Sequence, residues 1–226
     1  MLLKTKKLMK AFGGLKAINK VDFELPKNEI RGIIGPNGSG KSTFFNLVSG
    51  VYDPDPGSYI EFDGHDITNE PPHKVGELGL ARTFQLLRLY QDMSVINNVM
   101  SGYHTLVPYK FIDAVIGRKK IWDQEKVIKE EMMELLSFVG LADYAEMNAS
   151  ELSGGQRRLL VLARAIAGKP KLLMLDEPAA GLSPVNVDNL MKILMRLKEK
   201  YGLTLIIIEH ILKVVMDTCS KVTVLD

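Results

Sequence analysis

Three short apolar segments, each ending in polar or glycine-rich residues, restrict the fold of this chain more than any other feature. They are EIRGIIG (29–35), KLLMLDEP (171–178) and LTLIIIEH (203–210). KLLMLDEP is continuously apolar before its acids, which is typical of a strand buried on both faces of a parallel sheet. Helical patterns lie between the three segments along the chain, which predicts an α/β fold. Because ligands bind at the carboxyl ends of parallel strands, we expect these polar residues to meet in one crevice.

The first apolar segment runs into GPNGSGKS (35–42), a complete match to the phosphate-loop pattern GxxxxGK(S/T). A strand precedes it and a helical pattern, STFFNLVSG (42–50), follows it, as such a loop requires. Glycines let the backbone N–H groups curve around a phosphate, and the helix start adds a positive dipole. Lys41 can reach the β- and γ-phosphates, and the Ser42 hydroxyl can bind Mg²⁺. The alternative, a glycine-rich turn that happens to contain a lysine, leaves the matching flanks unexplained.

This loop therefore predicts a site for a nucleoside triphosphate with Mg²⁺. The residues expected to bind the nucleotide are Gly35, Asn37, Gly38, Ser39, Gly40, Lys41, Ser42 and Thr43.

The other two apolar segments end in acidic and imidazole groups. A strand-end aspartate such as Asp176 is expected to hold Mg²⁺, either directly or through one of its ligands, and the carboxylate of Glu177 can polarise a water. The pair taken alone is equally typical of a helix cap, but the phosphate loop upstream favours the functional interpretation. His210 follows Glu209 at the end of the third segment. A lone histidine is usually a surface or core residue, whereas the end of a parallel strand favours a functional one.

A second glycine-containing segment, LSGGQ (152–156), precedes the helical pattern RRLLVLARAIAGKP. Ser153 can cap this helix, and Gly154 and Gly155 leave room for a phosphate to approach its N–H groups. The alternative is a loop-to-helix junction that binds no ligand. The segment raises the question of why one chain would carry two phosphate sites.

Composition narrows the class of protein. The 226 residues carry 29 basic and 27 acidic side chains, a net charge of +2, so charge gives no case for nucleic-acid binding. The one cysteine, Cys219, excludes an internal disulfide and fits a reducing compartment. The N-terminus has no signal-peptide core, and no apolar run approaches the roughly 20 residues of a membrane helix. We expect any membrane role to come through a partner.

The helical and strand patterns also predict how the chain is organised. The first thirty residues, with Gly13, Gly14 and Pro26, suggest hairpins. From about residue 92 to 150 the pattern becomes helical, as in IWDQEKVIKEEMMELLSFVG. We predict one domain over 1–226: an α/β core with a β subdomain (1–91 and 157–226) and a helical subdomain with the LSGGQ segment (92–156).

Taken in order, GPNGSGKST, RTFQ, LSGGQ, LLMLDEP and IIEH resemble the nucleotide-binding domain of ABC-type ATPases, from about residue 10 to the end. AFGGLKAI, LARTFQLLRLYQDMSVINNV and DEPAAGLSP resemble more narrowly the ATP-binding subunits of branched-chain amino acid importers. The resemblance implies a phosphate-loop (P-loop) NTPase core with a parallel sheet, an N-terminal antiparallel β subdomain and an inserted α-helical subdomain. It also implies ATP as the nucleotide.

The resemblance implies roles for matching positions. Phe12 would stack on adenine, and Gln85 would sense the γ-phosphate and Mg²⁺; neither residue has a signal of its own in composition. Glu177 would be the general base and His210 the switch histidine that contacts the γ-phosphate. The helix start at LSGGQ would bind ATP held by a second copy, through the residues Ser153, Gly154, Gly155 and Gln156.

The implied partners are transmembrane permease subunits of an importer and a second ATPase subunit, either the same chain or a paralogue. The protein would then be cytoplasmic and peripheral on the inner face of the cell membrane, with residues 92–150 facing the permease. Two alternatives are an exporter subunit for lipid or polysaccharide and a soluble ABC ATPase acting on DNA or ribosomes. The latter usually has two cassettes or a coiled-coil insertion, and this chain has neither. The segment 107–120 mixes aromatic and basic residues, typical of a solvated surface more often than of a partner contact.

Two residues depart from the family pattern. Ser183 stands where Asn or Asp is usual, and Ile211 stands where an acidic residue commonly follows the switch histidine. Relatives also continue past KVTVLD through another hairpin and helix, which suggests a truncated chain.

Overall fold

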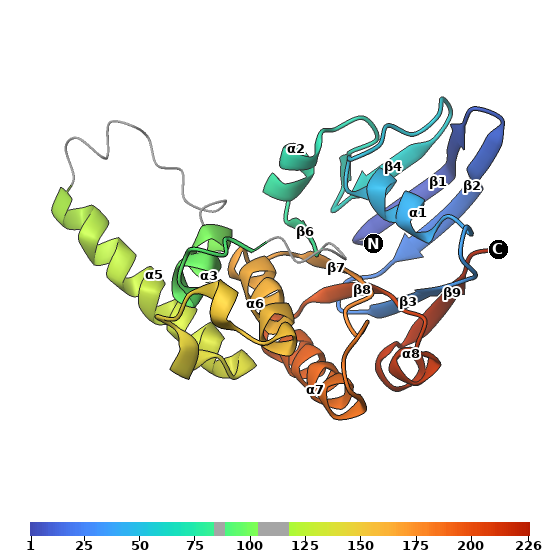
Figure 1. The fold of residues 1–226 in the computed structure, drawn as a ribbon. Helices are drawn as coiled ribbons and strands as arrows, with labels where there is room; N and C mark the ends of the chain where they lie inside the picture. Colours follow the sequence, from blue (N-terminus) through green and yellow to red (C-terminus); the bar gives the residue numbers. More distant parts are fainter. Residues whose placement is uncertain (84–88, 104–117) are drawn as a thin grey trace. The chain divides into compact units, whose positions relative to one another are not determined.

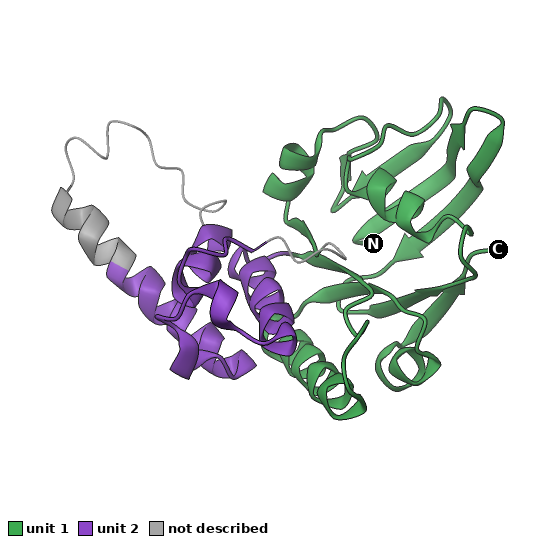
Figure 2. Ribbon diagram, in the orientation of Figure 1, with its two compact units in different colours: residues 1–85, 171–226 green, residues 86–170 purple. Residues whose placement is uncertain are grey.

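The computed structural model describes residues 1–83, 89–103 and 118–226, in two compact units. Unit 1 comprises Met1–Gln85 and Lys171–Asp226, and unit 2 comprises Leu86–Pro170 (Figure 2). The sequence-based boundary at 92–156 differs from this division, because helix α6 (Gly154–Ala167) packs with the helices before it. The assignment of functional domains stays a prediction, and each unit is described by itself.

Unit 1 contains an antiparallel sheet formed by the N-terminal part of the chain. Its strands are β1 (Leu3–Phe12), β2 (Leu15–Leu25), β4 (Tyr59–Phe62) and β5 (His65–Asp66), in the order β2-β1-β4-β5. A turn at Gly13 and Gly14 joins β1 to β2, and Phe12 pairs with Leu15 across it. The predicted antiparallel subdomain is confirmed.

The second sheet of unit 1 is parallel and has the order β6-β7-β8-β3-β9 (Figure 1). The predicted central strands are present as β3 (Ile30–Ile34), β7 (Leu172–Asp176) and β8 (Thr204–Ile208). The edges are β6 (Leu80–Arg82) and β9 (Lys221–Val224). Strand β6 was not predicted because three residues are too short to show a period. The carboxyl ends of β7, β8 and β3 lie side by side, as expected of neighbours in a parallel sheet.

One helix of unit 1 is buried between the two sheets. Helix α1 (Lys41–Val48) contributes Phe44 and Phe45 to a core that also includes Phe62 of β4 and Ile206 of β8. The other helices are α2 (Pro72–Glu77), α7 (Pro184–Tyr201) and α8 (Leu212–Thr218). Burying α1 fixes the start of the helix, and hence the loop before it, relative to both sheets.

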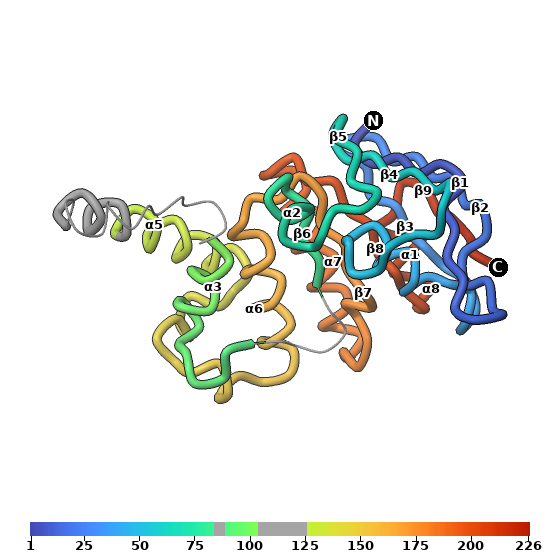
Figure 3. The backbone as a smooth tube through the Cα atoms, turned by 90° about the horizontal axis from the view of Figure 1, so that it is seen from above, coloured from blue at the N-terminus to red at the C-terminus, as the bar shows by residue number. Residues whose placement is uncertain are grey.

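Unit 2 is helical in the residues that the structure describes. It contains α3 (Val95–Tyr103), α5 (Arg118–Val139), two short 3₁₀ helices (Ala142–Tyr144 and Ala149–Glu151) and α6. The three longer helices pack against one another (Figures 1 and 3). A Cβ on Gly102 of α3 would lie 2.0 Å from the carbonyl oxygen of Arg164, so α3 and α6 approach closely. In the described part of the chain no helix is long and apolar enough to cross a membrane.

Candidate functional site

The phosphate loop connects β3 to α1, and its glycines lie where a side chain would clash or strain the backbone. Gly40 has φ +90°, and a Cβ there would lie 2.4 Å from the carbonyl oxygen of Ala17 in β2. Gly38 also has φ +90°. A Cβ on Gly35 would lie 2.1 Å from the carbonyl oxygen of Leu225. The loop is therefore closely fitted to its own unit, and its conformation depends on glycine.

The polar side chains of this loop suit a phosphate. Lys41 is 7% exposed, and its Nζ donates to the carbonyl oxygens of Gly35 and Pro36, at 2.8 Å each. The ammonium is thereby held over the loop. The Oγ of Ser39 is buried and has no hydrogen-bond partner among the described residues. A buried hydroxyl without a partner costs about 1–3 kcal/mol, a cost that a phosphate oxygen would remove. The residues present thus fit the triphosphate.

Asp176, at the end of β7, is held by Arg82, a residue that no sequence motif marks. The guanidinium of Arg82 in β6 contacts the Asp176 carboxylate at 3.1 Å and the Asn46 side-chain oxygen at 2.6 Å. Burial lowers the pKa of Arg82, and the bond to Asp176 opposes this shift. The only sequence signal was an arginine just before TFQ. The Ser42 hydroxyl and the Asp176 carboxylate are oxygen ligands of the kind that Mg²⁺ prefers, which is compatible with the predicted magnesium site.

The structure brings Glu177 and His210 into direct contact. The Oε1 of Glu177 lies 2.8 Å from the Nε2 of His210. Glu177 has φ +48°, a left-handed conformation that costs a non-glycine residue about 1–3 kcal/mol. Its N–H donates to the carbonyl oxygen of Ile208 at 3.0 Å, which ties the end of β7 to the end of β8. The strained turn lets the side chain of Glu177 reach across to His210.

Glu209 was noted in sequence only as the neighbour of His210, yet it is the most buried carboxylate of this strand edge. It is 2% exposed. Its carboxylate accepts hydrogen bonds from the N–H groups of Ala179 at 2.7 Å and His210 at 3.2 Å. Burial raises the pKa of Glu209, and the backbone N–H groups of Ala179, His210 and Ile211 oppose the shift. The signal available in sequence was an acid directly after five buried strand residues.

Phe12 has the exposure that stacking on a base requires. The ring is at the end of β1 and 45% exposed, and it contacts Tyr52 edge to face with the ring centroids 5.5 Å apart. Tyr52 lies shortly after α1, and Phe12 lies at the end of β1. Both rings are therefore close to the β1–β2 hairpin, whose residue Ala17 packs against Gly40 of the phosphate loop. No pattern in the sequence marks Tyr52.

The LSGGQ segment, in unit 2, begins α6. The Oγ of Ser153 accepts from the N–H of Gln156 at 3.3 Å, and the side chain of Gln156 accepts from the N–H of Ser153 at 2.9 Å. This reciprocal pair is a capping box. Ser153 and Gly154 are exposed, and a Cβ on Gly154 would meet no atom within 4 Å. The predicted cap is present, and the helix start is accessible.

The remaining predicted positions differ in what the structure shows. Gln85 lies outside the described residues. Asn37 is exposed in the phosphate loop, Thr43 lies in the first turn of α1, and Gly155 lies in the first turn of α6. Ser183 caps α7 by accepting from the N–H of Asn186 at 3.4 Å.

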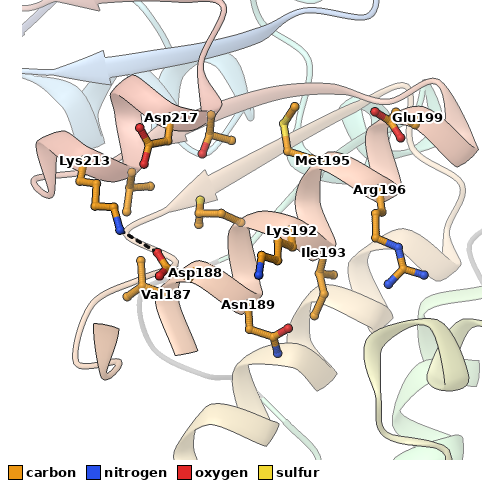
Figure 4. Close-up of a pocket in the computed structure, with 13 residues that line it drawn as sticks. Val187, Asp188, Asn189, Lys192, Ile193, Met195, Arg196, Glu199, Lys213 and Asp217 are labelled. Atoms are coloured by element: carbon orange, nitrogen blue, oxygen red, sulfur yellow. Dashed lines mark hydrogen bonds and ion pairs between the residues drawn. The ribbon is translucent and has the colours of Figure 1, made fainter. Parts of the chain in front are cut away.

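A cavity of about 560 Å³ in unit 1 lies elsewhere, between α7 and α8 (Figure 4). Its rim carries an ion pair between Lys213 and Asp188 at 3.0 Å. Met191, Met195 and Val214 line it, and none of the residues predicted for nucleotide binding does. The candidate site is therefore the strand edge and the phosphate loop rather than this cavity.

Comparison with known proteins decides the family, because residues 18–180 match the family model described as ABC transporter. The chain belongs to the ABC transporter family. It is 40% identical over 228 residues to the probable branched-chain amino acid transport ATP-binding protein LivG of Archaeoglobus fulgidus, covering 99% of this chain and 85% of that protein. It is 35% identical over 225 residues to the high-affinity branched-chain amino acid transport ATP-binding protein BraF of Pseudomonas aeruginosa, covering 100% of this chain and 88% of that protein.

A solved structure agrees with this ABC assignment. The ADP conformation of an ATP-binding cassette from an ABC transporter superposes with a TM-score of 0.84 and 33% identity, covering 99% of this chain and 87% of that one. The ABC fold predicted from sequence is confirmed, and the chain is a nucleotide-binding ATPase of this family.

Proposed function

We propose that this chain is the ATP-hydrolysing subunit of an ABC importer for branched-chain, hydrophobic amino acids. The observation that carries the proposal is 35–40% identity, over essentially the whole chain, to ATP-binding proteins named for branched-chain amino acid transport. The exporter and soluble-ATPase alternatives have no comparable support. Its partners would be membrane permease subunits, and its place the cytoplasmic face of the cell membrane.

Within the nucleotide site, the chain's own residues would neutralise and position the triphosphate. Lys41 exchanges its bonds to the Gly35 and Pro36 carbonyls for phosphate oxygens, together with the N–H groups of the loop. Ser42 and Asp176 would hold Mg²⁺, which supplies positive charge against the phosphates. Phe12 stacks on the base. Phosphoryl transfer depends on such positioning and charge more than on covalent chemistry.

Glu177 is proposed to accept the proton of the attacking water, and His210 to contact the γ-phosphate. Their 2.8 Å contact supports a shared task, because one side chain orients the other. Gln85 is assigned to γ-phosphate sensing by resemblance. The accessible helix start at Ser153 and Gly154 would bind the nucleotide of a second copy, which makes the active form a dimer. Closure on ATP and opening after hydrolysis would drive the permease.

Reconstitution tests the transport function. The chain is purified with its membrane partners, the partners are identified, and ATP-driven leucine uptake is measured in proteoliposomes. We expect uptake with the native chain and none with Glu177→Gln, which should bind ATP, stop turnover and trap a dimer. Fast hydrolysis by Glu177→Gln would refute its role as base. Permease partners of a lipid or polysaccharide exporter would refute the importer.

A further inference from the structure

One carboxylate joins the two loops that carry Glu177 and His210. The Oε1 of Glu209 accepts from the N–H of Ala179 at 2.7 Å, and its Oε2 accepts from the N–H of His210 at 3.2 Å. Ala179 follows Glu177 by two residues along the chain. The side chain of Glu209 therefore bonds both to the turn that follows Glu177 and to the backbone of His210.

The burial of these groups makes the link hard to replace. Ala179 is 0% exposed and Glu209 is 2% exposed, so water has little access to either partner. A buried N–H that loses its acceptor stays unsatisfied, and a buried carboxylate is tolerated only where several donors meet it. Backbone N–H groups of Ala179, His210 and Ile211 provide these donors.

The turn held by Glu209 is the one that directs Glu177. Glu177 is left-handed, with φ +48°, and its carbonyl oxygen accepts from the N–H of Ala180 at 3.1 Å. The carbonyl oxygen of Ala179 accepts from the N–H of Leu182 at 3.1 Å. An unfavourable backbone conformation persists only when the surrounding structure holds it. The hydrogen bond from Ala179 to Glu209 provides such support, because it ties this turn to a residue 30 positions away in the sequence.

We propose that Glu209 is a positioning residue that holds the turn after Glu177 against the start of the His210 segment and so maintains the contact between these two side chains. The proposal rests on the catalytic roles proposed for Glu177 and His210. It assigns Glu209 no contact with the nucleotide.

The first test follows His210 by NMR in the full chain without nucleotide, with a His210→Ala spectrum to assign its ring signals. We expect Glu209→Ala to move the His210 ring ¹⁵N signals toward those of a solvated histidine. The matched control is Glu29→Ala. Glu29 is also largely buried, bonds to Arg31 at 2.6 Å and directly precedes β3, at the amino ends rather than the carboxyl ends of these parallel strands. Its variant should leave the His210 signals in place.

The second test measures hydrolysis and nucleotide affinity. We expect Glu209→Ala to lower kcat by about tenfold to a hundredfold, the effect of losing one hydrogen bond to a charged group. KM should change by less than about threefold, because Glu209 does not contact the nucleotide. Glu209→Gln keeps one acceptor oxygen and should lose less. If Glu209→Ala does not fold, the NMR and kinetic measurements are made on Glu209→Gln, with Glu29→Gln as the control.

The outcomes separate this proposal from the function on which it rests. Unchanged His210 signals together with native kcat in a folded Glu209 variant would overturn the positioning role. An equal fall of kcat in the Glu29 variant would also overturn it, because the effect would then be general loss of stability. If Glu177→Gln and His210→Ala both hydrolyse ATP at the native rate, the catalytic assignment fails instead, and the NMR result still decides whether Glu209 positions His210.

Discussion

The two glycine-containing segments, the phosphate loop at 35–43 and LSGGQ at 152–156, differ in what their glycines accommodate. In the phosphate loop a Cβ on Gly35 or Gly40 would meet the chain's own backbone, 2.1 Å from the carbonyl oxygen of Leu225 and 2.4 Å from that of Ala17. At Gly154 a side chain would meet no atom of this chain. The glycine of the first segment is required by the fold. The glycine of the second is not, which fits a role in contacts that the single chain does not contain.

The largest expected effect is loss of nucleotide binding in Lys41→Ala. The variant removes the only buried ammonium of the phosphate loop. The loss of two charge-assisted hydrogen bonds to phosphate should weaken the affinity for ATP at least about a hundredfold. Titration with a fluorescent ATP analogue measures it. Lys192→Ala, an exposed lysine on α7 of the same unit that lines the separate cavity, is the control and should bind normally. Normal affinity in Lys41→Ala would refute the phosphate-loop assignment.

The second segment predicts a different defect. Gly154→Asp places a carboxylate at the accessible start of α6, where it would repel the phosphates of a nucleotide held by a second copy. We expect ATP binding by monomers within about twofold of native, but hydrolysis at least about a hundredfold slower and no ATP-driven dimer. Light scattering and turnover assays measure this.

The control for that variant is Gly76→Asp, another glycine whose Cβ would meet no atom within 4 Å, on α2. It should dimerise and hydrolyse as the native chain does. A Gly154→Asp protein that still dimerised with ATP would leave LSGGQ without its proposed role between copies.

The parts predicted correctly from sequence are those in which local pattern and backbone chemistry coincide. The central strands β3, β7 and β8 are short, mainly apolar segments because most of their residues are buried, so their sequence alone marks them. The helix cap at Ser153 follows from a serine placed directly before a helical pattern. Both signals are contained within a few residues.

The features missed from sequence depend on contacts between distant segments. Arg82 meets Asp176 across 94 positions of sequence, and Glu209 meets Ala179 across 30. Neither pair has a spacing that a pattern could reveal, since strand order brings β6, β7 and β8 together. Tyr52 is an ordinary loop residue until its ring is placed against Phe12.

Gly40 of the phosphate loop and Gly154 of LSGGQ can also be compared through the free energy of unfolding of their alanine variants. Gly40→Ala introduces a Cβ where φ is +90° and the Ala17 oxygen is 2.4 Å away, so we expect a loss of at least about 2 kcal/mol in the free energy of unfolding. Gly154→Ala adds a Cβ into open space in the first turn of a helix and should cost nothing or stabilise slightly. Urea unfolding of both variants measures the difference. Equal losses would mean that the phosphate-loop glycine is no more constrained by the fold than the other.

The smallest effect separates the two uses of Ser153, as cap of its own helix and as part of a surface for a second copy. Ser153→Ala removes the cap and should cost about 1 kcal/mol in unfolding free energy. Ser153→Asp keeps a good capping oxygen and favours the helix dipole, so its stability should match the native chain. The added charge should nevertheless suppress ATP-driven dimerisation, as in Gly154→Asp. If Ser153→Asp is stable and dimerises normally, the serine serves its own helix alone, and the difference between the two segments is one of local folding.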